Sequence, residues 1–345
     1  MPGVNGGRVK ALGEAWRGGV DDHVIDLAWS ADGTRLAAAS VGGPVSVFEG
    51  ASGRLAHRLA GHGFGTTSLS WSPRDGVLAT AGQDGQARAW DAATGAERFR
   101  VDGGAPWVER VSWSPRGDVL ATAAGKTLRF WDASGRLIRE APPQPSTIAD
   151  IRWRPRSDEL ATAAYGQLAF WKPDEPEPSR VFGWKGSMLA LAWSPEGRYL
   201  ATGDQDSTVH FWIVKTGEDL MMYGYPTKVR DLSWDSVGRY LGTAGGPQVT
   251  IWDCSGKGPA GTTPISLDRR RALITALEFR PSGPVLAVGG EDGGVRVWRV
   301  AKDCERLGAA NLGAEVTRVA WHPSGRSLAA ATATGTIGVF QTPWI

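Results

Sequence analysis

One pattern occurs eight times along the 345 residues, and it limits what the chain can fold into. Each copy has a short apolar strand ending in an aromatic residue, a Pro/Gly turn, a Leu-Ala-Thr-Ala-like strand, a second turn and a strand ending in another aromatic residue. A fixed period of about 40 residues indicates one supersecondary unit per copy, stacked on its neighbours. We number the copies repeats 1 to 8.

Two aromatic series mark the repeats. The first series is Trp29, Trp71, Trp113, Trp153, Trp193, Trp234, Phe279 and Trp321. The second series is Phe48, Trp90, Trp131, Trp171, Trp212, Trp252, Trp298 and Phe340. Together they use 13 of the 17 tryptophans, so the Trp content is explained by architecture and these side chains are predicted to be core.

The local pattern within each repeat is that of strands. Polar and apolar residues alternate in Thr127 to Trp131 and in Val295 to Trp298, and helical spacing is absent. Turns such as Ser194-Pro195-Glu196-Gly197 place Pro where φ is fixed near −65° and Gly where φ is positive, as hairpins require. The chain is therefore predicted to be all-β.

The Trp90-Asp91, Trp131-Asp132 and Trp252-Asp253 pairs, the Gly61-His62 pair and the period together resemble the WD-repeat family, over about residues 8 to 345. The resemblance implies a β-propeller, in which four-stranded antiparallel blades surround a central channel. Strands a to d of a blade run from the channel outward. With eight repeats, we expect a single eight-bladed propeller domain spanning residues 1–345, with the repeats at about 19–345.

The two ends of the chain are expected to meet. The last repeat lacks a following segment for its outer strand, because the sequence stops five residues after Phe340. Residues 8–18 have strand-like character without a partner, so they are predicted to close the ring as that outer strand and to remove an exposed edge. Trp16 is expected to anchor the closure.

The resemblance also implies a hydrogen-bonded tetrad in each blade, made of a His before strand a, a Ser/Thr on strand b, an Asp in the b–c turn and the Trp of strand c. Only repeat 2 supplies the full set, His62, Thr80, Asp84 and Trp90, which we interpret as structural. Asp206 and Asp292 repeat the turn Asp without the His. Cohesion in most blades is therefore expected to depend on Trp packing.

Composition and motifs argue against several classes of function. A net charge of +2 is too small to favour nucleic acid. Two cysteines, with neither a signal peptide nor a membrane-length apolar run, favour a soluble protein in the reducing cytoplasm. The Gly256-x-Gly258-x-x-Gly261 match lacks the helix that a dinucleotide site needs, and the five histidines form no ligand pattern. No catalytic residue, metal site or cofactor is predicted.

Partner contacts are expected on the top face, which in WD-repeat proteins is formed by the d–a and b–c loops. Positions four and six before the strand-a aromatic give Trp107, Glu109, Lys228, Arg230 and His23, among blander residues. The residue before each turn Asp adds Gln83, Gln205 and Glu291, and the longest connection adds Arg269, Arg270 and Arg271. Whether Trp107 is an interface or a packing residue, and whether the Arg group binds a partner or is a solvated loop, stays open at this level.

The favoured function is a non-enzymatic scaffold, expected to be monomeric, that binds a protein or peptide across this face. One alternative is a hydrolase that recruits inward-facing Asp, Glu and His side chains in the central channel. Another is nucleic-acid binding through Arg269 to Arg271, which the small net charge disfavours.

Overall fold

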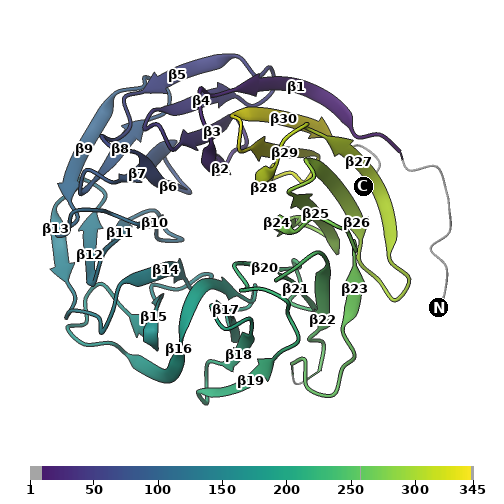
Figure 1. Ribbon diagram of the computed structural model, residues 1–345. Coiled ribbons are helices and arrows are strands. Elements are labelled where there is room, and N and C mark those ends of the chain that lie inside the picture. Colours follow the sequence, from purple (N-terminus) through teal and green to yellow (C-terminus); the bar gives the residue numbers. More distant parts are fainter. Residues whose placement is uncertain (1–9, 257, 343–345) are drawn as a thin grey trace.

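The computed structural model describes residues 10–256 and 258–342, and every regular element in them is a β-strand. The strands form antiparallel sheets arranged around a ring, with the early and late parts of the chain meeting at its upper right (Figure 1). In the described part of the chain no helix has the length and apolarity needed to cross a bilayer. The prediction of an all-β ring is confirmed.

Six sheets have four strands each. From the ring axis outward they are β2 (Val24–Trp29), β3 (Arg35–Ser40), β4 (Val45–Glu49), β5 (Leu55–Leu59); β6 (Thr66–Trp71), β7 (Val77–Gly82), β8 (Gln86–Asp91), β9 (Glu97–Asp102); β10 (Arg110–Trp113), β11 (Val119–Ala124), β12 (Thr127–Asp132), β13 (Leu137–Glu140); β20 (Asp231–Trp234), β21 (Tyr240–Ala244), β22 (Val249–Asp253), β23 (Ile265–Leu267); β24 (Ile274–Phe279), β25 (Val285–Gly290), β26 (Gly294–Arg299), β27 (Glu305–Asn311); and β28 (Val316–Trp321), β29 (Ser327–Thr332), β30 (Thr336–Gln341), β1 (Gly13–Gly19).

The prediction of eight separate four-stranded blades is wrong, because the described residues form seven sheets. The seventh has six strands, in the order β14 (Ile148–Trp153), β15 (Leu160–Trp171), β16 (Arg180–Trp193), β17 (Tyr199–Asp204), β18 (Val209–Ile213), β19 (Glu218–Met222). It arises because β16 runs through the place where the other repeats have a loop. Its first part pairs with β15 up to Ser187, and Met188 to Trp193 pair with β17, so repeats 4 and 5 share one sheet.

Ring closure by the N-terminal segment is confirmed. Strand β1 pairs antiparallel with β30 along its whole length, and both lie side by side at the rim (Figure 1). Just before β1, the Leu12 N–H donates to Ala309 O (2.9 Å) and the Ala309 N–H donates to Lys10 O (3.0 Å), which joins the segment to β27 as well. Residues 8 and 9 of the predicted closing segment lie outside the described residues.

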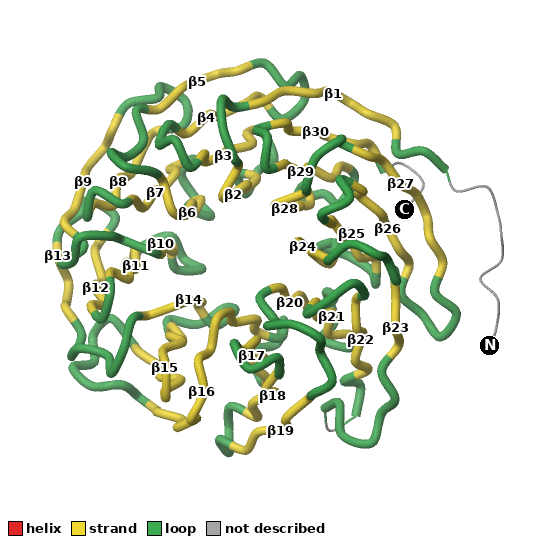
Figure 2. The backbone as a smooth tube through the Cα atoms, in the orientation of Figure 1, coloured by secondary structure: helices red, strands yellow, loops and turns green. Residues whose placement is uncertain are grey.

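The aromatic series owe their spacing to the register of the sheets. In repeat 2, Trp71 lies opposite Leu78, which lies opposite Trp90 on the next strand. The core is divided into clusters, each drawn from two successive repeats, so these side chains pack between neighbours. Six of the seven first-series indoles also bridge the inner strands, as where Trp71 Nε1 donates to Ala28 O (2.9 Å), and Trp113 is the exception. Figure 2 shows the strands in yellow and the loops that connect consecutive strands in green.

Candidate functional site

Two kinds of connection lie together on one side of the ring, and we call this side the top face. They are the b–c turns within a repeat and the d–a loops that lead to the next repeat. Backbone hydrogen bonds join them: the Gln83 N–H donates to Gly65 O and the Gln205 N–H donates to Ser187 O, both at 2.9 Å. The top face is therefore a continuous, backbone-anchored surface, as a rigid binding platform requires.

The structure brings the repeat 2 tetrad together beneath this face. Trp90 Nε1 donates to Thr80 Oγ1 (3.0 Å), Thr80 Oγ1 lies 2.7 Å from His62 Nε2, and His62 Nδ1 lies 2.8 Å from Asp84 Oδ1. Burial lowers the pKa of His62, which keeps the ring neutral with Nδ1–H donating to Asp84 and Nε2 accepting from Thr80. Burial opposes the charge of Asp84, but the hydrogen bonds from His62 and from the Gln86 N–H hold its pKa below the usual value. This buried chain orders the loop around Gly63.

Other repeats fill the place of His62 with different residues. The equivalent positions, nine before the strand-a aromatic, hold Val20, Gly104, Gln144, Trp184, Tyr225, Arg270 and Leu312. In repeat 6, Tyr225 Oη takes the role of the imidazole, lying 2.7 Å from Thr243 Oγ1 and accepting from Trp252 Nε1 (2.9 Å). The sequence prediction considered only His at this position and missed these substitutes, although their fixed spacing, nine residues before the strand-a aromatic, is visible in the sequence.

Arg270 is the substitute in repeat 7, so it is not available to a partner. Its side chain is 2% exposed and forms ion pairs with Asp268 and Asp292, and Asp268 also pairs with Arg296. Its guanidinium donates further to Gly294 O (3.0 Å). The predicted Arg group therefore has a buried middle member, and only Arg269 and Arg271 are exposed.

The two basic segments of the top face lie on either side of one turn, residues 245–248. The Thr227 N–H donates to Gly245 O (3.0 Å) on one side, and the Arg270 N–H donates to Pro247 O (2.7 Å) on the other. Lys228 and Arg230 are exposed, and Val229 between them is fully buried. The structure thus brings these predicted contacts close to Arg269 and Arg271.

Trp107 lies on the top face in the loop between β9 and β10, and 53% of it is exposed. The next residue, Val108, is fully buried and its N–H donates to Gly82 O (3.0 Å), which fixes the loop from below. Glu109 is half-buried, and its Oε2 accepts the Gly125 N–H (2.8 Å). Glu109 therefore braces a turn, whereas the Trp107 indole is free to contact a partner.

Three exposed apolar residues that sequence reasoning missed lie on the top face in repeats 1, 2 and 4, two of them on loops and one within the long strand β15. They are Val41 (43% exposed), Phe64 (89%) and Tyr165 (59%), and with Trp107 we call them the apolar arc. Their loops adjoin: a Cβ on Gly65 would lie 2.7 Å from Val41 O, and one on Gly85 would lie 2.9 Å from Ala105 O, two residues before Trp107. Phe64 has φ of 65°, an uncommon value for a non-glycine residue.

The remaining predicted contacts also lie on top-face connections. Gln205 and Glu291 are exposed in b–c turns, and Glu291 Oε2 accepts the Leu273 N–H (3.2 Å). Gln83 and His23 are half-buried, and His23 O accepts the Val41 N–H (3.0 Å). Gln83 and His23 lie beside the apolar arc, and Gln205 and Glu291 lie on the basic side.

Three of the four carboxylates on the inner strands, which the hydrolase alternative would recruit, join those strands, and Asp231 on β20 is the fourth. Asp26 Oδ2 accepts the Leu69 N–H (2.8 Å), Asp150 Oδ2 accepts the Leu191 N–H (3.0 Å), and Glu278 Oε2 accepts the Trp321 N–H (2.7 Å). Each bond satisfies an inner-strand N–H of the following repeat, which has no ladder partner on that side. Within residues 10–256 and 258–342, no three His, Cys, Asp or Glu side chains could together hold a metal ion.

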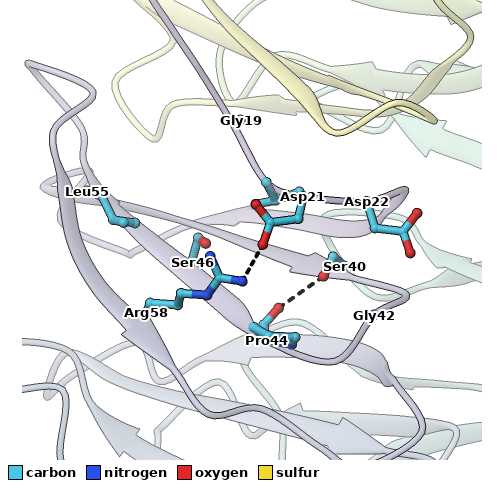
Figure 3. A pocket seen from close by; sticks show the side chains of 10 residues that line it. Gly19, Asp21, Asp22, Ser40, Gly42, Pro44, Ser46, Leu55 and Arg58 are labelled. Atoms are coloured by element: carbon cyan, nitrogen blue, oxygen red, sulfur yellow. Dashed lines mark hydrogen bonds and ion pairs between the residues drawn. The ribbon is translucent and has the colours of Figure 1, made fainter.

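A small hollow lies where the ring closes. Asp21, Ser40, Ser46 and Arg58 line it, and Arg58 forms an ion pair with Asp21 across it, while the Asp22 carboxylate points away from Arg58 (Figure 3). The ion pair joins β5 to the loop that follows β1, so it contributes to closure.

Comparisons with known proteins identify the family. The model of the WD domain, G-beta repeat, matches residues 53–91, 99–132, 176–212, 266–299 and 307–341, which together make just over half of the chain. No curated protein matches the chain. Among solved structures, the computationally designed Ika8 protein is similar in fold, with 21% sequence identity over 97% of this chain and 100% of that chain and a TM-score of 0.81. The chain belongs to the WD40-repeat family.

Proposed function

We propose that the chain is a non-enzymatic scaffold that binds a protein or peptide partner on its top face, with the apolar arc as the primary contact. The observation that carries this proposal is the exposure of Trp107 and Phe64 on neighbouring, backbone-anchored loops. Exposed aromatic residues held in a fixed position contribute disproportionately to binding energy, because little conformational entropy is lost when they are covered.

The strain at Phe64 supports the same interpretation. A positive φ at a non-glycine residue costs on the order of 1 kcal/mol, and an 89% exposed ring recovers little of it by burial. Folding alone gives no reason to present a phenyl ring in this way, whereas a partner that covers the ring does.

Family membership supports the scaffold role in general terms, since WD-repeat propellers typically bind other proteins. Three of the four inner-strand carboxylates join strands, which leaves Asp231 alone among them for the hydrolase alternative. A monomeric state and a cytoplasmic location stay predictions; free thiols at Cys254 and Cys304 are compatible with a reducing compartment.

The test compares capture of partners from native lysate by the wild type, Phe64→Ala/Trp107→Ala and Val237→Ser. Val237 is 75% exposed in the a–b turn of repeat 6, on the opposite side of the ring, and serves as the control. A partner that binds the wild type and the control, and binds the double variant at least about tenfold more weakly, supports the proposal. Equal binding to all three, with melting temperatures unchanged, contradicts it.

A further inference from the structure

Five cations gather on the top face over repeats 5 to 7. They are Lys185, Lys228, Arg230, Arg269 and Arg271, and we call them the cationic patch; all five are exposed. The patch begins beside Tyr165, where the apolar arc ends, because Tyr165 pairs with Ser187. The whole chain has a net charge of only +2, so the patch is a local concentration of positive charge and does not reflect a general excess of Lys and Arg.

Backbone contacts hold the three segments of the patch next to one another. The Gln205 N–H bonds to Ser187 O, close to Lys185, and the Val229 N–H bonds to Asp204 O (3.1 Å) in the same turn. The turn 245–248 then joins the segment around Lys228 to the segment around Arg270. The cations are therefore carried on a preformed surface, which lowers the entropic cost of binding.

The five cations are also unpaired. Within the described residues none of them has a carboxylate within ion-pair distance, whereas Arg98, Arg129 and Arg180 each have one. Their neighbour Arg270 differs, because it forms ion pairs with both Asp268 and Asp292. The fold uses the local carboxylates for one buried arginine, and the flanking Arg269 has a neutral partner, since its Nε donates to Gln248 Oε1 (3.3 Å).

Three acidic residues lie near the patch and limit what it can bind. Asp206 accepts from Thr208 Oγ1 (2.7 Å), Glu291 accepts from the Leu273 N–H, and Asp231 begins the inner strand β20. These carboxylates lie between the cations, so they would repel the closely spaced phosphates of a nucleic-acid backbone. A peptide with separated carboxylates can place them on the cations, and each Arg guanidinium can bind a carboxylate with two hydrogen bonds.

We infer that the cationic patch binds an acidic peptide segment of the same partner whose apolar side chains cover the apolar arc. This inference rests on the proposed function and adds the chemistry of the partner, which has an apolar anchor and a carboxylate-rich stretch that follow one another along the top face. The anchor supplies most of the affinity, and the carboxylates set orientation and association rate.

The experiment measures fluorescence anisotropy of labelled octaglutamate with the full chain at low salt, about 50 mM, where exposed charges are little screened. Octaglutamine and an oligothymidylate of equal length are the comparison probes. The variants are Lys228→Glu/Arg230→Glu and, as a second pair, Arg269→Gln/Arg271→Gln. The control is Lys215→Glu/Arg326→Glu, which makes the same change in net charge as the first pair, at exposed, unpaired residues of c–d and a–b turns, outside the top face.

We expect octaglutamate to bind the wild type and the control within about twofold, and to bind both patch variants at least about tenfold more weakly. Three results overturn the inference: octaglutamine binding as tightly as octaglutamate, the control losing as much affinity as the patch variants, or oligothymidylate binding more tightly than octaglutamate. Phe64→Ala/Trp107→Ala should leave octaglutamate binding unchanged. If the partner depends on the apolar arc while octaglutamate shows no specific binding, this inference fails and the proposed function stands.

Discussion

Replacing Trp16 with Ala should destabilise the protein far more than the same replacement at Trp107. Trp16 is 8% exposed and packs against Phe48 of repeat 1 with ring centroids 5.8 Å apart, and its Nε1 donates to Gly50 O (2.9 Å). A Cβ on Gly53 would lie only 2.5 Å from the Trp16 ring, so the indole lies directly on the c–d turn. Trp16 therefore joins the last sheet to the first.

The magnitude follows from the buried area. A Trp side chain hides roughly 200 Å² when fully buried, which is worth up to about 5 kcal/mol. Compaction of the unfolded chain reduces this to about 3–4 kcal/mol, and the lost hydrogen bond adds about 1 kcal/mol. Trp107 is 53% exposed, so the same substitution there should cost no more than about 2 kcal/mol.

Urea unfolding followed by far-ultraviolet circular dichroism measures both losses, with the m value as a check that the unfolding unit is unchanged. Deleting residues 1–18 should give at least the loss seen for Trp16→Ala, because it also exposes the edge of β30. If the two Trp→Ala variants lose the same free energy of unfolding to within about 0.5 kcal/mol, the reasoning that ring closure carries the stability is refuted.

Three further predictions concern buried polar groups. Asp204 is fully buried, and burial together with the charge of Asp206 raises its pKa to about 7. Because the folded pKa exceeds the unfolded one, the contribution of Asp204 to stability is complete below about pH 4 and is lost as the pH rises through 7. Asp204→Asn should therefore flatten the fall in the free energy of unfolding between about pH 5 and 8. His62→Ala should cost about 2–4 kcal/mol in denaturant unfolding, because it leaves Thr80 and Asp84 without their partner; a loss under about 1 kcal/mol would contradict the tetrad's role. Trp298 Nε1 is buried without a partner, whereas Thr122 and Thr162 supply the acceptor for the equivalent indoles of repeats 3 and 4. Val288→Thr would supply that acceptor in repeat 7 and should be neutral or stabilising in a thermal melt. Val297 is equally buried, and Val297→Thr should destabilise the protein.

The sequence allowed the ring and its closure to be predicted, because both depend on features that repeat. The Trp and Leu positions recur at a fixed period, and the register Trp71–Leu78–Trp90 follows from that spacing. The fused sheet was missed because it depends on one local departure. Residues 180–193 contain no Pro, and strand β16 continues through a register shift at Trp184 to Gly186, where other repeats turn away from the sheet.

The candidate site was predicted less well, for a physical reason. Register places a residue on the top face, but the direction of its side chain depends on its neighbours. Lys228 and Arg230 alternate around the buried Val229 and therefore point outward. Arg269, Arg270 and Arg271 look equivalent in sequence, and only the carboxylates of Asp268 and Asp292 in the folded repeat select Arg270 for burial.

The position of Arg270 also explains why the tetrad can vary without loss of the fold. At the site nine residues before the strand-a aromatic, some repeats place a group that satisfies buried donors or acceptors beneath a top-face loop, whereas Val20, Gly104 and Leu312 place none there. His62 does this with an imidazole, Tyr225 with a hydroxyl and Arg270 with a guanidinium. Each of these side chains fixes the loop above it through different hydrogen bonds or ion pairs. The exposed side chains of the loops can therefore differ from repeat to repeat. The apolar arc over repeats 1 to 4 and the cationic patch over repeats 5 to 7 are two surfaces that such divergence permits on one scaffold.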